Sequence, residues 1–474
     1  MKKMKRKMMC VLMALGVLVA QGQAPDTTQT QTDTMALSLE QAQAYALQNS
    51  PVLKNANLDL DIAKKKIWET TAIGLPQVSG KLAASYQLKM SESVKQFSGL
   101  SSLGSWMYGV DQTLLNITKN EEAFGHVPAA EPSDPVSEND MKWGATFDLT
   151  VSQLLFSGGY LVGLQTTKVF KSLSEIAITK SKNDLVESVS NAYYLILVMQ
   201  ENKQLMDSIY AKTLKITAEM EAMHKSGFVE ETTVDQMTLT SNTLKNTVLA
   251  MSNQIEVSKN LLRLQLGLEM TQQINLTDKL EPLVNQNINL QLMTSDYNVN
   301  SNSDYQLMET QVKLRQLNLK LQKSALLPDI AAFYQYDHNF NKNAMSFTPP
   351  HLIGVGMNIP IFGSGQKISR ISQARMELTK AENQKYQVSL AMQLAYSDAK
   401  ATYSNAINKM ETNKESMDLA RKIFERTAIK LKNGMASSLE LTQAQTQYLQ
   451  AQTTYYTTVI ELVNAKNKLE KLSK

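Results

Sequence analysis

The sequence contains an internal repeat, and each copy joins segments with the period of a β-strand to segments with the period of an α-helix. Residues 155–159, Leu-Phe-Ser-Gly-Gly, return 206 residues later as 361–365, Ile-Phe-Gly-Ser-Gly. Ser226-Gly227 returns as Asn433-Gly434, and a Leu-Pro pair stands before the first strand-like segment of each copy. A repeat that combines strand-period segments with very long helix-period segments excludes most soluble folds.

The amino terminus has the layout of an export signal. Residues 1–7 are strongly basic, residues 8–20 are apolar, and the small residues Gly22 and Ala24 follow. An apolar stretch of 13 residues is too short to span a bilayer. We predict a signal peptide over residues 1–24, cleaved after Gly22 or after Ala24. The only cysteine, Cys10, lies inside it, so the mature chain is expected to have no thiol chemistry.

Four segments alternate between apolar and polar positions with the period of a β-strand. Val78, Leu82 and Tyr86 share one face of the first segment, while Ser79 and Lys81 lie on the other. Strands are expected at about 77–88, 142–156, 328–339 and 351–362. A strand of roughly ten residues crosses a bilayer when it is tilted.

The pattern changes to helix directly after the second strand of each pair. Residues 160–226 and 366–432 contain no proline and span 67 positions each, which corresponds to about 100 Å of helix. Gly227 and Gly434 are expected to end these helices. Shorter helices are predicted at 233–269, 440–474, 52–74 and 304–326. End-to-end stacking of a return helix on one of the 23-residue helices would nearly match a long helix in length.

The two copies differ in their connections. The first repeat is assigned to residues 37–272 and the second to residues 304–474, with an asparagine-rich equatorial connector at 273–303 that packs outside the helices. The first strand pair also carries a long outer loop, 89–141, which contains Pro128, Pro132 and Pro135 among acidic residues. We predict this loop to be polar and poorly structured.

The chain resembles the TolC-like outer membrane efflux proteins, or outer membrane factors. The resemblance rests on the order and spacing of the strand pairs, the Leu-Pro and Phe-x-x-Gly turns and the tip glycines. The resemblance covers residues 37–474 and includes the tip segments 227–229 and 433–445. It implies an α+β membrane protein whose homotrimer forms a 12-stranded β-barrel continuous with a periplasmic α-helical barrel. It also implies an outer-membrane location, contact with outer-membrane lipid, and most of the mass in the periplasm.

The same resemblance implies a passive exit duct of a tripartite efflux or type I secretion system. The partners are then a periplasmic adaptor (membrane fusion) protein and an inner-membrane pump, with no cofactor. In the family an acidic residue six positions after the tip glycine lines the periplasmic aperture. Glu440 stands at that spacing in the second repeat, and Thr233 stands there in the first.

The candidate site residues fall into three groups. The aperture candidates are Glu440, Thr233, Glu230, Glu231, Asp235 and Gln443. The helix-tip turns and candidate adaptor contacts are Gly227, Phe228, Gly434 and Met435. The strand-to-helix turns are Gly158, Gly159, Gly363 and Gly365.

Other chemistry finds little support in the sequence. The four histidines are scattered without the spacing of metal ligands, and no nucleophile, base and metal combination indicates an enzyme. The net charge of +4 includes five basic residues of the signal, so nothing points to nucleic acid. The alternative is a soluble periplasmic coiled-coil scaffold or adaptor without a pore, which explains the helices but leaves the alternating strands unexplained.

Overall fold

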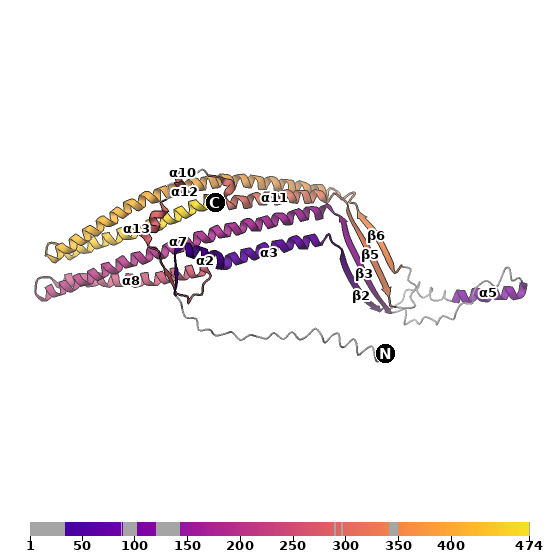
Figure 1. Cartoon of the computed structure of the whole chain (residues 1–474), viewed down its shortest axis with the longest axis horizontal. Coiled ribbons are helices and arrows are strands. Elements are labelled where there is room, and N and C mark those ends of the chain that lie inside the picture. Colours follow the sequence, from indigo (N-terminus) through magenta and orange to yellow (C-terminus); the bar gives the residue numbers. More distant parts are fainter. Residues whose placement is uncertain are drawn as a thin grey trace, which may run out of the picture.

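The computed structural model of the chain describes residues 34–86, 88, 102–119, 143–288, 291–294, 297–340 and 349–473. The predicted signal peptide over 1–24 lies outside these residues. The molecule is a long body in which helices run from two hairpin tips at one end to a sheet at the other (Figure 1). Within the described residues no helix is both long and apolar enough to span a membrane.

Each repeat contains one very long helix and a pair of shorter ones. The long helices are α7, Gly158–Lys225 with 68 residues, and α12, Gln366–Lys432 with 67 residues. The return helices are α8, Glu231–Leu266, and α13, Ser438–Ser473, with 36 residues each. The helices next to the sheet are α3, Pro51–Ala72, and α11, Ser303–Ser324, with 22 residues each. The helices of the two repeats therefore match almost residue for residue in length.

The return helices stack end to end on the short helices. At the first joint, a Cβ added to Gly267, just after α8, would lie 2.9 Å from Cδ of Pro51, the first residue of α3. At the second joint, the buried Asn302 accepts a hydrogen bond from the backbone N–H of Asp304 at 2.9 Å and donates one to the carbonyl of Leu472 at 3.3 Å. Asn302 thus caps the start of α11 and satisfies a carbonyl at the end of α13.

The sheet has the order β2-β3-β5-β6, and each neighbouring pair is antiparallel. Its strands are β2 Gln77–Tyr86, β3 Trp143–Phe156, β5 Asp329–Asn339 and β6 His351–Asn358. The last strand ends at Asn358, before the expected residue 362. Pro360 follows within two residues and has no N–H to donate to a ladder.

The interior consists of two apolar clusters along the helices. The larger lies at mid-length, where α7, α12 and α13 contribute Tyr193, Ile196, Tyr403 and Leu462, each fully buried. The smaller lies toward the tips and includes Met237 and Phe424, with Leu431. These clusters hold the two repeats side by side and leave the sheet to project beyond them.

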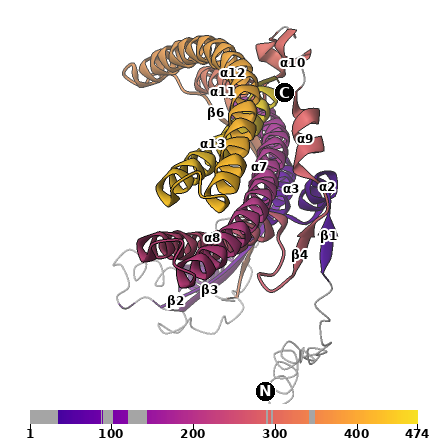
Figure 2. The same ribbon diagram turned by 90° about the vertical axis from the view of Figure 1, so that its left-hand side faces the viewer.

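The equator contains more regular structure than the sequence pattern indicates. Strand β1, Met35–Leu37, pairs in parallel with β4, Ile274–Leu276, and helix α2, Leu39–Asn49, follows β1. Helices α9, Leu280–Asn287, and α10, Gln291–Thr294, and the 3-10 helix η2, Val299–Ser301, occupy the connector. Figure 2 shows α9, α10, β1 and β4 together on one side of the helices. The hydroxyl of Tyr193 fixes this layer by donating to the Leu37 carbonyl at 2.9 Å.

The segment 89–141 is not the uniformly unstructured loop that we expected. Helix α5, Ser102–Thr118, lies within it. The prolines that indicated a loop all follow residue 119, whereas Met107, Val110, Leu114 and Ile117 recur with steps of three and four residues. The expectation was wrong for this part because the proline-rich, acidic composition of 121–140 does not extend to 102–119. Residues 89–101 and 120–141 lie outside the described residues.

Candidate functional site

The two helix tips are built by the same backbone motif. After α7, the N–H of Gly227 donates to His224 O at 2.8 Å and the N–H of Phe228 donates to Met223 O at 2.9 Å. After α12, Gly434 and Met435 donate in the same way to Leu431 O and Lys430 O, at 3.0 and 2.8 Å. Both patterns are Schellman motifs, which require a left-handed residue after the helix. Gly227 and Gly434 supply it with φ of 80° and 70°.

Large apolar side chains project from both tips. Phe228 is 79% exposed and Met435 is 68% exposed. They occupy equivalent positions, each directly after the left-handed glycine. Exposed apolar side chains that gather at one place on a protein often mark a site of contact with another protein.

The aperture candidates lie in the first turns of the two return helices. Glu440 is exposed. Its carboxylate accepts a hydrogen bond from the Ser437 hydroxyl at 3.3 Å, and its backbone N–H donates to Oγ of Ser437 at 3.2 Å. Thr233 lies in the corresponding turn of α8, where its N–H donates to Glu230 O at 3.0 Å. An acidic residue in this place also interacts favourably with the helix macrodipole.

The remaining acidic candidates are exposed around the first tip. Glu230 precedes α8 as its N-cap residue, and Glu231 is the first residue of the helix. Asp235 lies one turn further along α8. The structure thus places these acidic groups and Glu440 at the same end of the molecule, at the starts of the two return helices.

Gln443 lines a groove between α12 and α13. The groove has a volume of about 650 Å³ and is bordered by amide and hydroxyl side chains of α13, among them Thr446, Gln447 and Gln450, and by Asn413 of α12. The amide and hydroxyl groups that line this groove can both donate and accept hydrogen bonds. Its first lining residue on α13 is Thr442, two positions after Glu440.

Polar contacts tie the two tips to each other. Ser438 of α13 is buried and donates to Gln236 of α8 at 2.7 Å. Two ion pairs link the long helices, Lys432 to Glu219 at 3.1 Å and Lys212 to Glu425 at 3.0 Å. These contacts join the first and second repeats within one chain, close to the aperture candidates.

The strand-to-helix turns differ between the repeats. Gly158 is buried, and an added Cβ would lie 2.9 Å from Cδ1 of Leu327 and 2.9 Å from Cβ of Ser324, whereas Gly159 has only ordinary contacts. Gly363 and Gly365 have open space around them, and Gly365 has a φ of 79°. The first turn needs its first glycine for close packing, and the second needs Gly365 for its backbone conformation.

The sheet has two chemically different faces. The residues Val78, Val151, Tyr334 and Ile353 form one row across all four strands. Val78 is 67% exposed and Ile353 is 82% exposed, so the outer strands leave their apolar side chains uncovered by the described residues. The opposite face carries Ser79, Thr150 and Gln335 in the adjacent row, with Leu352 at its β6 position.

Aromatic side chains gather at the end of the apolar face that lies away from the helices. Tyr86 is paired with Trp143 across β2 and β3. Tyr334 forms a hydrogen bond of 2.8 Å with Nδ1 of His351, and the Tyr336 ring lies 5.1 Å from the same histidine. Amphipathic aromatic rings are typical of the level where a bilayer meets water.

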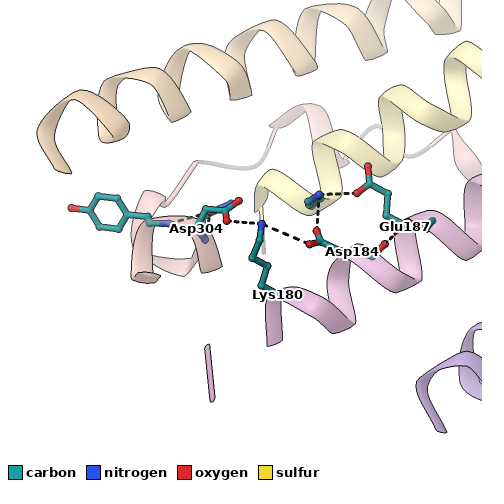
Figure 3. Close-up of polar contacts among 8 residues, drawn as sticks. Lys180, Asp184, Glu187 and Asp304 are labelled. Atoms are coloured by element: carbon teal, nitrogen blue, oxygen red, sulfur yellow. Dashed lines mark hydrogen bonds and ion pairs between the residues drawn. The ribbon is translucent and has the colours of Figure 1, made fainter. Parts of the chain in front are cut away.

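An ion-pair cluster at the equator connects three helices (Figure 3). Lys180 of α7 lies 2.6 Å from Asp304 of α11, and Lys471 of α13 lies 2.7 Å from Asp184 and 2.9 Å from Glu187, both of α7. Burial disfavours the charged form of Lys471, but its hydrogen bonds to Asp184 and Glu187 outweigh that effect and raise its pKa. The cluster thus fixes both ends of the equatorial joint to one stretch of α7.

Among the residues described by the structure, no group of three or more His, Cys, Asp or Glu side chains could hold a metal ion. His224 contacts the carbonyl of Val229 at 2.9 Å and belongs to the first tip, whereas His338 and His351 belong to the aromatic end of the sheet. His126 lies outside the described residues.

The comparisons with known proteins agree with this architecture. Residues 299–473 match the outer membrane efflux protein family. No curated protein sequence matches the chain. Its fold is similar to that of the outer membrane protein VceC from Vibrio cholerae, with 15% identity, coverage of 92% of this chain and 96% of that chain, and a TM-score of 0.66.

Two further solved structures are similar over most of their length. CusC is 15% identical, with coverage of 93% of each chain and a TM-score of 0.68. The CmeC outer membrane channel of Campylobacter jejuni is 14% identical, with coverage of 92% of this chain and 85% of that chain and a TM-score of 0.67. The match of residues 299–473 to the outer membrane efflux protein family agrees with the resemblance seen in the sequence, and the similar solved structures confirm the fold class. The matched family and the similar solved structures are outer membrane proteins, in agreement with the expected location.

Proposed function

We propose that the chain is the outer-membrane exit duct of a tripartite efflux or type I secretion system. The observation that carries the proposal is the two-faced sheet at one end of a helical body about 100 Å long. A four-stranded sheet with free edges cannot close a pore alone. Three copies around an axis would place twelve strands in a closed cylinder, with the apolar face toward lipid and the polar face toward water.

The helical tips are the proposed meeting point with the other components. Phe228 and Met435, exposed at equivalent positions, would contact a periplasmic adaptor, and the adaptor would join the duct to an inner-membrane pump. Three copies of Glu440 and Thr233 would surround the periplasmic aperture. The chain itself conducts passively and performs no catalysis in this proposal.

Paired lysine substitutions on neighbouring positions of β2 test the orientation of the sheet. Leu82 is 74% exposed on the apolar face, and Ala83 points to the polar face. A lysine on a lipid-facing strand costs about 2–4 kcal/mol near the bilayer centre. We expect Leu82→Lys to reduce strongly the protein recovered in outer membranes after a high-salt wash, whereas Ala83→Lys should be recovered like the wild type.

The alternative function, a soluble periplasmic scaffold, makes the opposite prediction. A scaffold would be released by the high-salt wash, and Leu82→Lys would not change its distribution. Equal recovery of the two lysine variants would therefore contradict the proposed membrane-embedded sheet.

A further inference from the structure

Three charged side chains form one row across the polar face of the sheet. Lys81 of β2 is paired directly with Asp148 of β3, and Asp148 is paired directly with Asp337 of β5. Directly opposed residues in an antiparallel sheet have Cβ atoms roughly 5 Å apart. The row therefore concentrates one positive and two negative groups at a single level of the sheet.

Packing does not account for this arrangement. Two carboxylates opposite each other destabilise a strand pair, and the next row of the same face has Ser79, Thr150 and Gln335 on the same three strands instead. The Gln335 amide donates to both oxygens of Asp337, at 3.1 and 3.3 Å. This amide holds the carboxylate of Asp337 in place on the face that the proposed duct turns toward water.

The row carries a net charge of −1 in each chain. The other charged residue on the polar face of the described strands is Asp329, at the helix-side end of β5, eight residues from Asp337. In a closed trimer the three rows would meet at one level of the lumen and form a ring. Rings of acidic side chains inside low-dielectric walls raise the local concentration of cations.

We propose that the Lys81–Asp148–Asp337 row makes the strand-lined part of the duct selective for cations, with Lys81 moderating the effect. This inference rests on the proposed function, since it needs a water-filled lumen. It assigns ion selectivity to a level far from the tips, separate from Glu440. Cationic solutes would then be the class of substrate that this part of the duct conducts most readily.

Reversal potentials across planar bilayers with a salt gradient test the proposal. The wild type should favour cations. Asp148→Asn combined with Asp337→Asn should lower the ratio of cation to anion permeability at least about two-fold, and Lys81→Met should raise it. The charge-conserving variant Asp337→Glu should keep the wild-type ratio. An unchanged ratio in both the double-asparagine and the Lys81→Met channels would overturn the proposal.

Failure of this inference is distinct from failure of the proposed function. If the row is not selective, every variant conducts with the same permeability ratio, whereas a protein that is not a duct shows no channels at all. If the double variant does not assemble, Lys81→Met decides: a higher ratio supports the row, and an unchanged ratio contradicts it.

Discussion

The ammonium of Lys471, at the end of α13, lies 2.7 Å from the carboxylate of Asp184, near the middle of α7. This contact joins the last turn of the second repeat to the long helix of the first. With Lys180 and Asp304 it surrounds the joint at which α13 meets α11. The equator is thus the level where α7, α11 and α13 are held in one register.

Lys471→Met should destabilise the protein. The substitution removes the cation next to Glu187, which is 25% exposed, and leaves Asp184, which is 39% exposed, only its longer contact with Lys180 at 3.7 Å. We expect a loss of about 1–2 kcal/mol, less than for a fully buried pair, because solvent screens these groups in part. Thermal denaturation in detergent measures it. Lys64→Met, in the exposed pair with Asp61, is the matched control and should change stability by less than about 0.5 kcal/mol.

Gly158→Ala should destabilise the junction between the sheet and the helices. The added methyl group would lie 3.2 Å from the Ser324 carbonyl oxygen as well as against two side-chain carbons, so α7 and α11 would have to separate. Overpacking of this kind costs about 1–3 kcal/mol. Gly159→Ala introduces the same group at the next position without close contacts and should be nearly neutral. Equal melting temperatures for the two variants would show that the packing at Gly158 is unimportant.

The contact between the connector and α12 should depend on pH. A hydrogen bond from Lys414 at 2.9 Å lowers the pKa of Glu281 below its ordinary 4.5, and the same bond raises the pKa of Lys414 above 10.5. The folded state therefore gains stability from Glu281 above pH 4.5 and loses it as the pH falls through the lowered pKa. The contribution of Lys414 is lost only as the pH rises above 10.5.

Spin labels at Gln286→Cys and Glu415→Cys would report the distance between α9 and α12. The distance distribution should broaden at acidic pH, below the ordinary pKa of a glutamate. With Glu281→Gln it should be broad already at neutral pH. A distribution that stays narrow in acid would contradict the role of this ion pair.

Much of the architecture could be predicted because it is local in the sequence. The glycines at 227 and 434 each follow a proline-free helical pattern, and a left-handed C-terminal residue is a short-range signal. The strand segments were visible from their alternation. The β1–β4 pair was missed because three-residue strands more than 200 residues apart leave no periodicity to detect.

The two charged clusters could not be predicted for a related reason. Lys180, Asp304 and Lys471 come from helices whose relative register depends on tertiary packing. Likewise, the alternation placed Lys81 on the polar face of its strand, but opposition to Asp148 required the pairing register of β2 and β3. The sequence shows the basic and acidic residues, but it does not show which of them lie opposite each other in the folded chain.

Glu440→Gln should change the ion conductance of the aperture. Glutamine keeps the hydrogen-bonding group next to Ser437 and the capping position, but it removes the charge that three chains would bring together. We expect weaker block by Mg²⁺ added on the periplasmic side, measured in single-channel recordings. Thr233→Ala, at the corresponding uncharged position, should leave the block unchanged. Equal block in wild type and Glu440→Gln would remove Glu440 from the aperture.

The central claim is that the chain forms a conducting duct, and single-channel recording of the purified protein in planar lipid bilayers tests it most directly. The account predicts discrete conductance steps from a trimer, and no such steps from Leu82→Lys protein prepared in the same way. Purified protein that produces no channels in repeated trials, while remaining folded, would contradict the account.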